Sequence, residues 1–183
     1  MGHYVLDKGA SRFTVRAFAS GMLSALGHNP TIAIRDFAGD ANFDPAAPTQ
    51  ASLRIRIQAA SLEVTDDISS RDRREIESLM KEKVLESVKY PTVAFESTAA
   101  SASQLSEGRF RMNIDGTLTL HGVTDRVPVL AQVALLGGML RASGEFSILQ
   151  TSYGIPLITV GGGALKLKDE LKFTFDVVAR KQE

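Results

Sequence analysis

The sequence predicts an all-β fold, in which antiparallel strands close into a barrel or pack as a sandwich, with one helix alongside. From residue 109 to residue 181, apolar and polar residues alternate over four segments. This period of two places the apolar residues of each segment on one face of a strand. A Gly137-Gly138 pair separates two of the segments and is typical of a tight hairpin. Strands with one apolar face each must bury those faces together, so a barrel or a sandwich follows.

The N-terminal half carries the same alternation in shorter pieces. We expect strands over residues 11–18, 31–43, 53–58 and 92–97. Within the second of these, Phe37 is out of phase with Ile34, so we expect a bulge near Arg35-Asp36 that restores the register. The run DPAAP at 44–48 predicts a rigid turn before the next strand.

One segment breaks the alternation and predicts a helix at about residues 69–83. Ile76, Leu79 and Met80 have the three-four spacing of an amphipathic helix. Ser69, with Asp72 three residues later, resembles a capping box at the N-terminus of this helix. Pro91 ends any helix before it and keeps the preceding residue extended. We therefore expect one long helix beside the strands.

Composition limits the classes of function. A chain of 183 residues is expected to form one domain, residues 1–183. The 21 Lys and Arg residues balance the 21 Asp and Glu residues, so no positive surplus favours nucleic acid as a partner. The chain has no cysteine, which excludes disulfides and thiolate catalysis. No apolar run reaches the length of a transmembrane helix.

The sequence leaves the cellular compartment open. No basic segment followed by an apolar stretch lies at the N-terminus, so no signal peptide is visible. If the chain is a mature exported form, its location is periplasmic or secreted. If the sequence is complete as written, its location is cytoplasmic.

Residue types that carry catalysis or bind metals are sparse. The histidines, His3, His28 and His121, are widely separated, and no acidic or cysteine cluster accompanies them. We therefore expect neither a metal site nor a cofactor. No serine has the G-x-S-x-G context of a hydrolase nucleophile, and no Gly-Lys-Ser or Gly-Lys-Thr follows the glycine run 161–163. The protein is predicted not to be an enzyme and to have no catalytic residues.

Several motifs resemble those of one known family. The run LTLHGVT at 118–124 resembles the L-T-[IL]-H-G-V-T signature of the YceI-like family, whose members are polyisoprenoid-binding, lipocalin-like proteins. The run KYPT at 89–92, followed by Phe95 and Ser97, resembles that family's K-Y-P-x-x-x-F-x-S stretch. The run TSYGI at 151–155 resembles its [ST]-x-[FY]-G-I loop. The motifs occur in the family's order across nearly the whole chain.

The resemblance implies an antiparallel, lipocalin-like β-barrel with a flanking helix and a long apolar lumen. It implies non-enzymatic binding, carriage or storage of a long apolar ligand, either an isoprenoid or quinone or a fatty-acyl compound. Members of the family are often dimeric, so the resemblance is also compatible with a homodimer. The residues themselves leave a second function open, because a barrel packed shut would act as a structural or protein-interaction module.

If the lumen is open, inward-facing apolar residues of the strands line it. The alternation selects these ligand-binding candidates: Phe13, Val15, Ile34, Leu53, Ile55, Phe95, Met112, Ile114, Leu118, Phe146 and Ile148.

A segment without regular period, residues 21–30, is a candidate lid over the lumen. Glycines loosen its backbone, and Met22 and Leu26 would supply an apolar side that closes over the ligand. His28 in this segment and Tyr153 in the late loop are the polar candidates for contact with a ligand head group. In the alternative reading, Met22 and Leu26 complete the core and His28 faces solvent.

Overall fold

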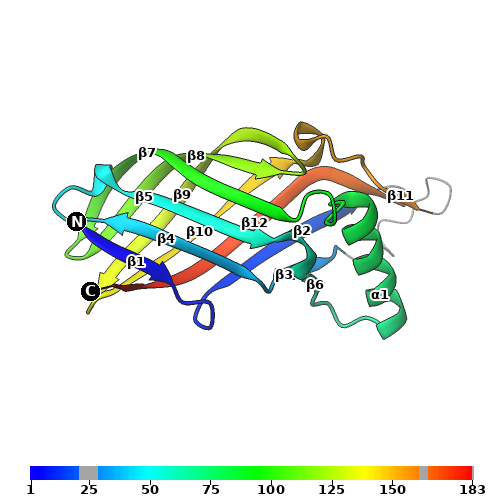
Figure 1. Ribbon diagram of the computed structural model, residues 1–183, viewed down its shortest axis with the longest axis horizontal. Helices are drawn as coiled ribbons and strands as arrows, with labels where there is room; N and C mark the ends of the chain where they lie inside the picture. The colour runs from blue at the N-terminus through cyan, green and yellow to red at the C-terminus, as the bar shows by residue number, and fades with distance from the viewer. Residues whose placement is uncertain (21–28, 161–164, 183) are drawn as a thin grey trace.

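The chain forms an elongated antiparallel barrel with one long helix at one end (Figure 1), which confirms the predicted fold class. The computed structural model describes residues 1–20, 29–160 and 165–182. Its strands are β1 Gly2–Leu6, β2 Arg12–Ser20, β3 Thr31–Ile34, β4 Phe37–Phe43, β5 Ser52–Gln58, β6 Leu62–Val64, β7 Thr92–Ser106, β8 Arg109–Leu120, β9 Val123–Leu136, β10 Met139–Leu149, β11 Thr159–Val160 and β12 Leu165–Lys181. The helix α1 is Ser70–Leu79, and a π-helical turn, Met80–Val84, continues it.

Strand β12 closes the barrel. One edge of β12 pairs with β10 from Glu170 to Arg180. Its other edge pairs with β2 and then, at Ala179 to Lys181, with β1. Because β1 also pairs with β4, the described strands include a closed circuit of eight: β1, β4, β5, β7, β8, β9, β10 and β12. Both termini lie at the β1 end of this barrel, and α1 lies at the opposite end (Figure 1).

The barrel is not closed along its full length. Strands β2, β3 and β6 extend the sheet toward the helix end, and β6 pairs with β3. Strands β5 and β7 pair only as far as Gln58 and Thr92, and the described residues contain no pairing between β6 and β7. A seam therefore opens between these two strands, and α1 lies in the chain between them.

The strand pairing is interrupted where the alternation of apolar residues changes phase. The single strand expected over residues 31–43 is two strands, because the chain leaves the ladder at Arg35-Asp36, between buried Ile34 and buried Phe37. The change of phase predicted there is a break between strands and not a bulge within one. Because of this break, β3 pairs with β2 and β6, whereas β4 pairs with β1 and β5. Residues 31–43 therefore contribute β4 to the closed circuit and β3 to the extension formed by β2, β3 and β6.

Helix α1 is anchored to the edge strand β6 by its own side chains. The Ser69 hydroxyl accepts a hydrogen bond from the Asp72 amide at 3.1 Å, which is the predicted N-cap. The Val64 amide donates to Glu77 Oε1 at 2.9 Å, and Arg73 Nη1 donates to the Val64 carbonyl at 3.1 Å. Both polar groups of Val64, which face no further strand, are thus satisfied by the helix.

The segment after the helix is tied to the β8–β9 hairpin. His121 and Gly122 form the two-residue loop of this hairpin, with φ angles of 52° and 75°, the type I′ geometry. His121 Nε2 lies 2.6 Å from Glu86 Oε2, and its ring packs 4.5 Å from the Tyr90 ring, centroid to centroid. A Cβ on Gly122 would lie 2.6 Å from the Tyr90 ring. The two sequence motifs at 89–92 and 118–124 therefore meet in space.

Two glycines in the barrel wall make room for aromatic rings. A Cβ on Gly116 would lie 2.2 Å from Phe95 Cζ and 2.8 Å from the Glu96 carbonyl oxygen. A Cβ on Gly144 would lie 2.7 Å from Phe175 Cζ and 2.3 Å from the Leu130 carbonyl oxygen. Because backbone atoms are among these neighbours, turning a ring aside would not relieve the contacts.

We predict that Gly116→Ala and Gly144→Ala each lower the free energy of unfolding by about 1–3 kcal/mol, because overpacking forces the strand backbones apart. Gly9→Ala is the matched control, since a Cβ there meets its nearest atom at 3.5 Å and should change stability by less than about 0.5 kcal/mol. Urea denaturation of the three variants measures this. Equal stability of all three would contradict the packing argument.

Candidate ligand cavity

Three apolar chambers follow one another through the barrel. The helix-end chamber and the central chamber each have a volume of about 120 Å³, and the far chamber, near the termini, has a volume of about 90 Å³. Ile34, Ile57, Val93 and Phe173 line both the helix-end and central chambers. Leu53, Ile55, Ile114, Ala142 and Val177 line both the central and far chambers. The shared lining residues show that the chambers adjoin one another in a row inside the barrel, and we refer to the three together as the lumen.

The helix-end chamber lies behind the seam between β6 and β7. Ile76, Leu79 and Met80 of the helix segment form part of its wall. Ile155 and Ile158, from the irregular segment before β11, form another part. The wall of this chamber is therefore built from a helix and a loop as well as from strands.

The central chamber has an aromatic wall. Phe95 and Phe175, the rings that Gly116 and Gly144 accommodate, both border this chamber. Phe146 and Phe173 are cross-strand partners on β10 and β12, and their rings stack at 5.0 Å between centroids with an interplanar angle of 6°. Phe95 and Phe175 lie against the glycine backbone of the wall, so the central chamber keeps a space that larger residues at the two glycine positions would remove by pushing the rings inward.

The far chamber ends at an aromatic wall. Phe43 lines the chamber, and its ring meets the Phe110 ring edge to face, 5.3 Å between centroids at 74°. Both side chains are only 2% exposed. On the other side of this pair, Phe110 and Tyr4 line an open depression of about 670 Å³ on the outside of the barrel end.

The surface of the lumen is almost entirely apolar, and a few polar residues border it: Gln150, Asp40, Asn42, Ser52, Ser97 and Thr174. Among the described residues, Gln150 is the one polar side chain that lines the helix-end chamber. Its Nε2 donates to the Lys168 carbonyl at 2.9 Å, and the residue is 3% exposed. Asp40 borders the far chamber, but its carboxylate is directed to His3 and Arg54, at 3.5 Å and 3.7 Å.

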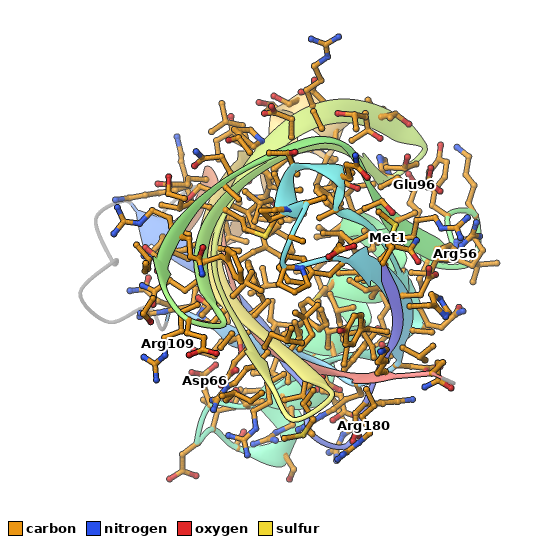
Figure 2. All side chains as sticks on the ribbon, turned by 90° about the vertical axis from the view of Figure 1, so that its left-hand side faces the viewer. Met1, Arg56, Asp66, Glu96, Arg109 and Arg180 are labelled. Atoms are coloured by element: carbon orange, nitrogen blue, oxygen red, sulfur yellow. The ribbon has the colours of Figure 1, made fainter. Side chains whose placement is uncertain are left out.

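The charged side chains lie on the outside of the barrel. Viewed from the end that carries the termini, Arg56, Glu96, Arg109 and Arg180 project away from the barrel wall (Figure 2). The described residues contain no group of three His, Cys, Asp or Glu side chains that could hold a metal ion. Among these residues, each helix falls short of the length and apolar character needed to cross a bilayer.

The structure places most of the predicted ligand-binding residues along the lumen. The following line at least one chamber: Phe13, Val15, Ile34, Leu53, Ile55, Phe95, Met112, Ile114, Leu118 and Phe146. Ile148 and Tyr153 are buried but line none of the three chambers. Met22, Leu26 and His28, with the rest of the predicted lid from 21 to 28, lie outside the described residues.

Tyr153 packs beneath the β8–β9 hairpin instead. Its carbonyl oxygen lies 3.2 Å from His121 Nδ1, and the residue is 1% exposed. Burial, reinforced by the nearby Asp125 carboxylate, raises the pKa of the Tyr153 hydroxyl to about 12. These contacts place Tyr153 in the junction between the hairpin and the late loop.

Sequence reasoning missed the walls contributed by the helix and the late loop. The three-four spacing identified Ile76, Leu79 and Met80 as the apolar face of the helix, but no sequence signal placed that face over the lumen. Ile155 and Ile158 lie in a segment without a period. The signals that could have pointed to Ile155 are its apolar character within a turn-rich segment and its place at the end of the TSYGI run.

Comparison with known proteins identifies relatives across the chain. The sequence profile described as a YceI-like domain matches residues 4–179. A UPF0312 protein of Azotobacter vinelandii is 31% identical over 171 residues, which cover 91% of this chain and 74% of that protein. A UPF0312 protein of Pseudomonas syringae pv. tomato is 29% identical over 97% of this chain and 87% of its own length.

Solved structures share the fold. BcnA of Burkholderia cenocepacia has a TM-score of 0.73 at 20% identity, covering 94% of this chain and 98% of its own. A polyisoprenoid-binding domain from Saccharophagus degradans, implicated in plant cell wall breakdown, has a TM-score of 0.68 at 14% identity over the full length of both chains. At these identities the likeness establishes the fold.

We predict that Tyr153 contributes to a loss of stability in alkaline solution. Its pKa in the folded chain, about 12, lies above the ordinary tyrosine value of 10.0. The stability that the neutral, buried hydroxyl contributes is therefore complete below about pH 10 and is lost as the pH rises toward 12. Between about pH 9 and pH 11, the free energy of unfolding should fall by about 1 kcal/mol more in the wild type than in Tyr153→Phe. Chemical denaturation at the two pH values measures this, and equal losses would contradict it.

Proposed function

This chain belongs to the YceI-like family, and we propose that it binds, carries or stores a long apolar molecule in the barrel lumen without catalysing a reaction on it. The observation that carries this proposal is the row of three adjoining chambers whose walls are apolar. An isoprenoid or quinone is the first candidate, because a neighbouring structure is a polyisoprenoid-binding domain. A fatty-acyl compound is the second.

The size of the chambers supports a ligand over a barrel that is packed shut. Protein interiors normally leave few voids larger than a water molecule. An empty apolar cavity costs about 24 cal/mol per Å³, so a chamber of about 120 Å³ costs about 3 kcal/mol if nothing fills it. Two such chambers and a smaller one would consume much of the 5–15 kcal/mol of stability that a domain has. An apolar tail recovers that cost when it fills them.

The chemistry of the lumen favours binding over catalysis. A buried alkyl chain contributes about 0.8 kcal/mol per CH₂, so a tail of about ten carbons supplies micromolar affinity or better after ordering costs. Acid–base catalysis would need a titratable group within reach of the ligand. The one charged residue that borders the chambers in the described part of the chain is Asp40, and its carboxylate is directed to His3 and Arg54.

The proposal predicts that blocking the lumen abolishes uptake of long ligands. Ile114 lies on β8 at the boundary between the central and far chambers, so Ile114→Trp should reduce uptake of a long polyprenol by about tenfold or more. The loss follows from the methylenes that remain in water. Native mass spectrometry of solvent-extracted protein, reloaded with solanesol, measures uptake.

The matched control is Asn113→Trp, which places the same side chain on the exposed outer face of the same strand. Uptake by this variant should match the wild type. Equal uptake by a folded Ile114→Trp would move the ligand out of the lumen. A wild-type protein that neither carries a lipid after purification nor takes up a polyprenol or a fatty acid would favour the structural or interaction module.

A further inference from the structure

We propose that the Phe43–Phe110 pair is a length stop, which sets the longest tail that the lumen accommodates. This inference rests on the proposed function, because it assigns a role to the end of the same lumen. It makes chain length, rather than a polar contact, the property by which the protein selects among ligands of one chemical class.

The chambers are ordered along a single strand. On β8, Met112 lines the far chamber, Ile114 lines the far and central chambers, Leu118 lines the central chamber and Leu120 lines the helix-end chamber. These inward residues span eight positions, or about 27 Å along the strand. A tail that passes from the helix end to the far end therefore meets them in a fixed order.

An aromatic pair separates the far chamber from the depression outside the barrel end. Phe43 borders the far chamber from within, and Phe110 borders the depression outside the barrel end. The ring contact of 5.3 Å between centroids joins them. The wall between the lumen and the outer depression is thus no thicker than these two rings. Removing either ring would connect the two spaces.

Strand pairing fixes the backbone of Phe43 and Phe110 at the far end of the lumen, whereas the helix end lacks such pairing across the seam between β6 and β7. Phe110 is paired on both sides, with Gln104 of β7 and Val133 of β9, and Phe43 is paired with Gly2 of β1. At the helix end the strands β6 and β7 separate, and the helix supplies the wall. The proposed length stop therefore has the ligand enter at the helix end with its tail leading, so that the tail stops at Phe43.

The length stop has a measurable consequence. Each isoprene unit added to a ligand should strengthen binding by about tenfold or more while the tail remains inside the lumen. Once the tail reaches the Phe43–Phe110 pair, further units stay in water and affinity stops rising. The chain length at which affinity levels off is the limit set by the wall.

The experiment measures this limit with a series of linear polyprenols: geraniol, farnesol, geranylgeraniol and solanesol. Phe43→Ala and Phe110→Ala should shift the limit to longer chains, because the lumen then opens into the outer depression. Met112→Trp fills the far chamber and should shift it to shorter chains. Phe18→Ala is the matched control, since Phe18 lines none of the chambers and lies beneath the Arg16 guanidinium.

The results distinguish a failure of the proposed length stop from a failure of the proposed ligand binding. A limit that is the same in the wild type, folded Phe43→Ala and Met112→Trp overturns the length stop and leaves lumen binding intact. If the alanine variants fail to fold, Phe43→Leu, which retains an apolar side chain, and Met112→Trp decide the matter in the same way. Absence of binding for every polyprenol in the wild type overturns the proposed function itself.

Discussion

The architecture depends on the double pairing of β12. One edge of this strand pairs with β10, and the other pairs with β2 from Lys166 to Asp176 and with β1 from Ala179 to Lys181. Strand β2 continues the sheet toward the helix end, through β3 and β6. Strand β1 pairs with β4 and so closes the circuit. A strand of 17 residues is needed to serve both partners in succession. Closure at one end and a seam at the other are consequences of this division.

The seam explains why a mostly β protein retains one long helix. Where β6 separates from β7, an apolar interior would face water and the edge of β6 would be unpaired. The apolar side of the helix covers the interior, and Arg73 and Glu77 satisfy both backbone groups of Val64 at that edge. Glu86 and His121 hold the other end of the segment to the β8–β9 hairpin. The helix is thereby fixed at two places across the opening.

The sequence predicts which strand residues point into the barrel better than it predicts whether the barrel interior is filled or hollow. Alternation identified inward residues such as Met112 and Leu118, and the change of phase between Ile34 and Phe37 located the break in the second long segment. Alternation carries no information about volume, so it does not distinguish a filled core from a lumen. That difference arises from tertiary pairs such as Gly116 with Phe95, which are distant in sequence. Tyr153 was predicted as a head-group contact, whereas the structure buries it against the hairpin loop.

The composition of the lumen determines where discrimination between ligands can arise. A charged head group would lose its hydration in chambers that offer no counter-charge, so such a group stays at the helix end or outside. Gln150 provides one neutral polar side chain there, and it is already held by the Lys168 carbonyl. Apolar walls bind any apolar tail in proportion to the area buried, and they do not distinguish one methylene from another. Selection must then come from shape, which means from the width between facing rings and from the position of the far wall.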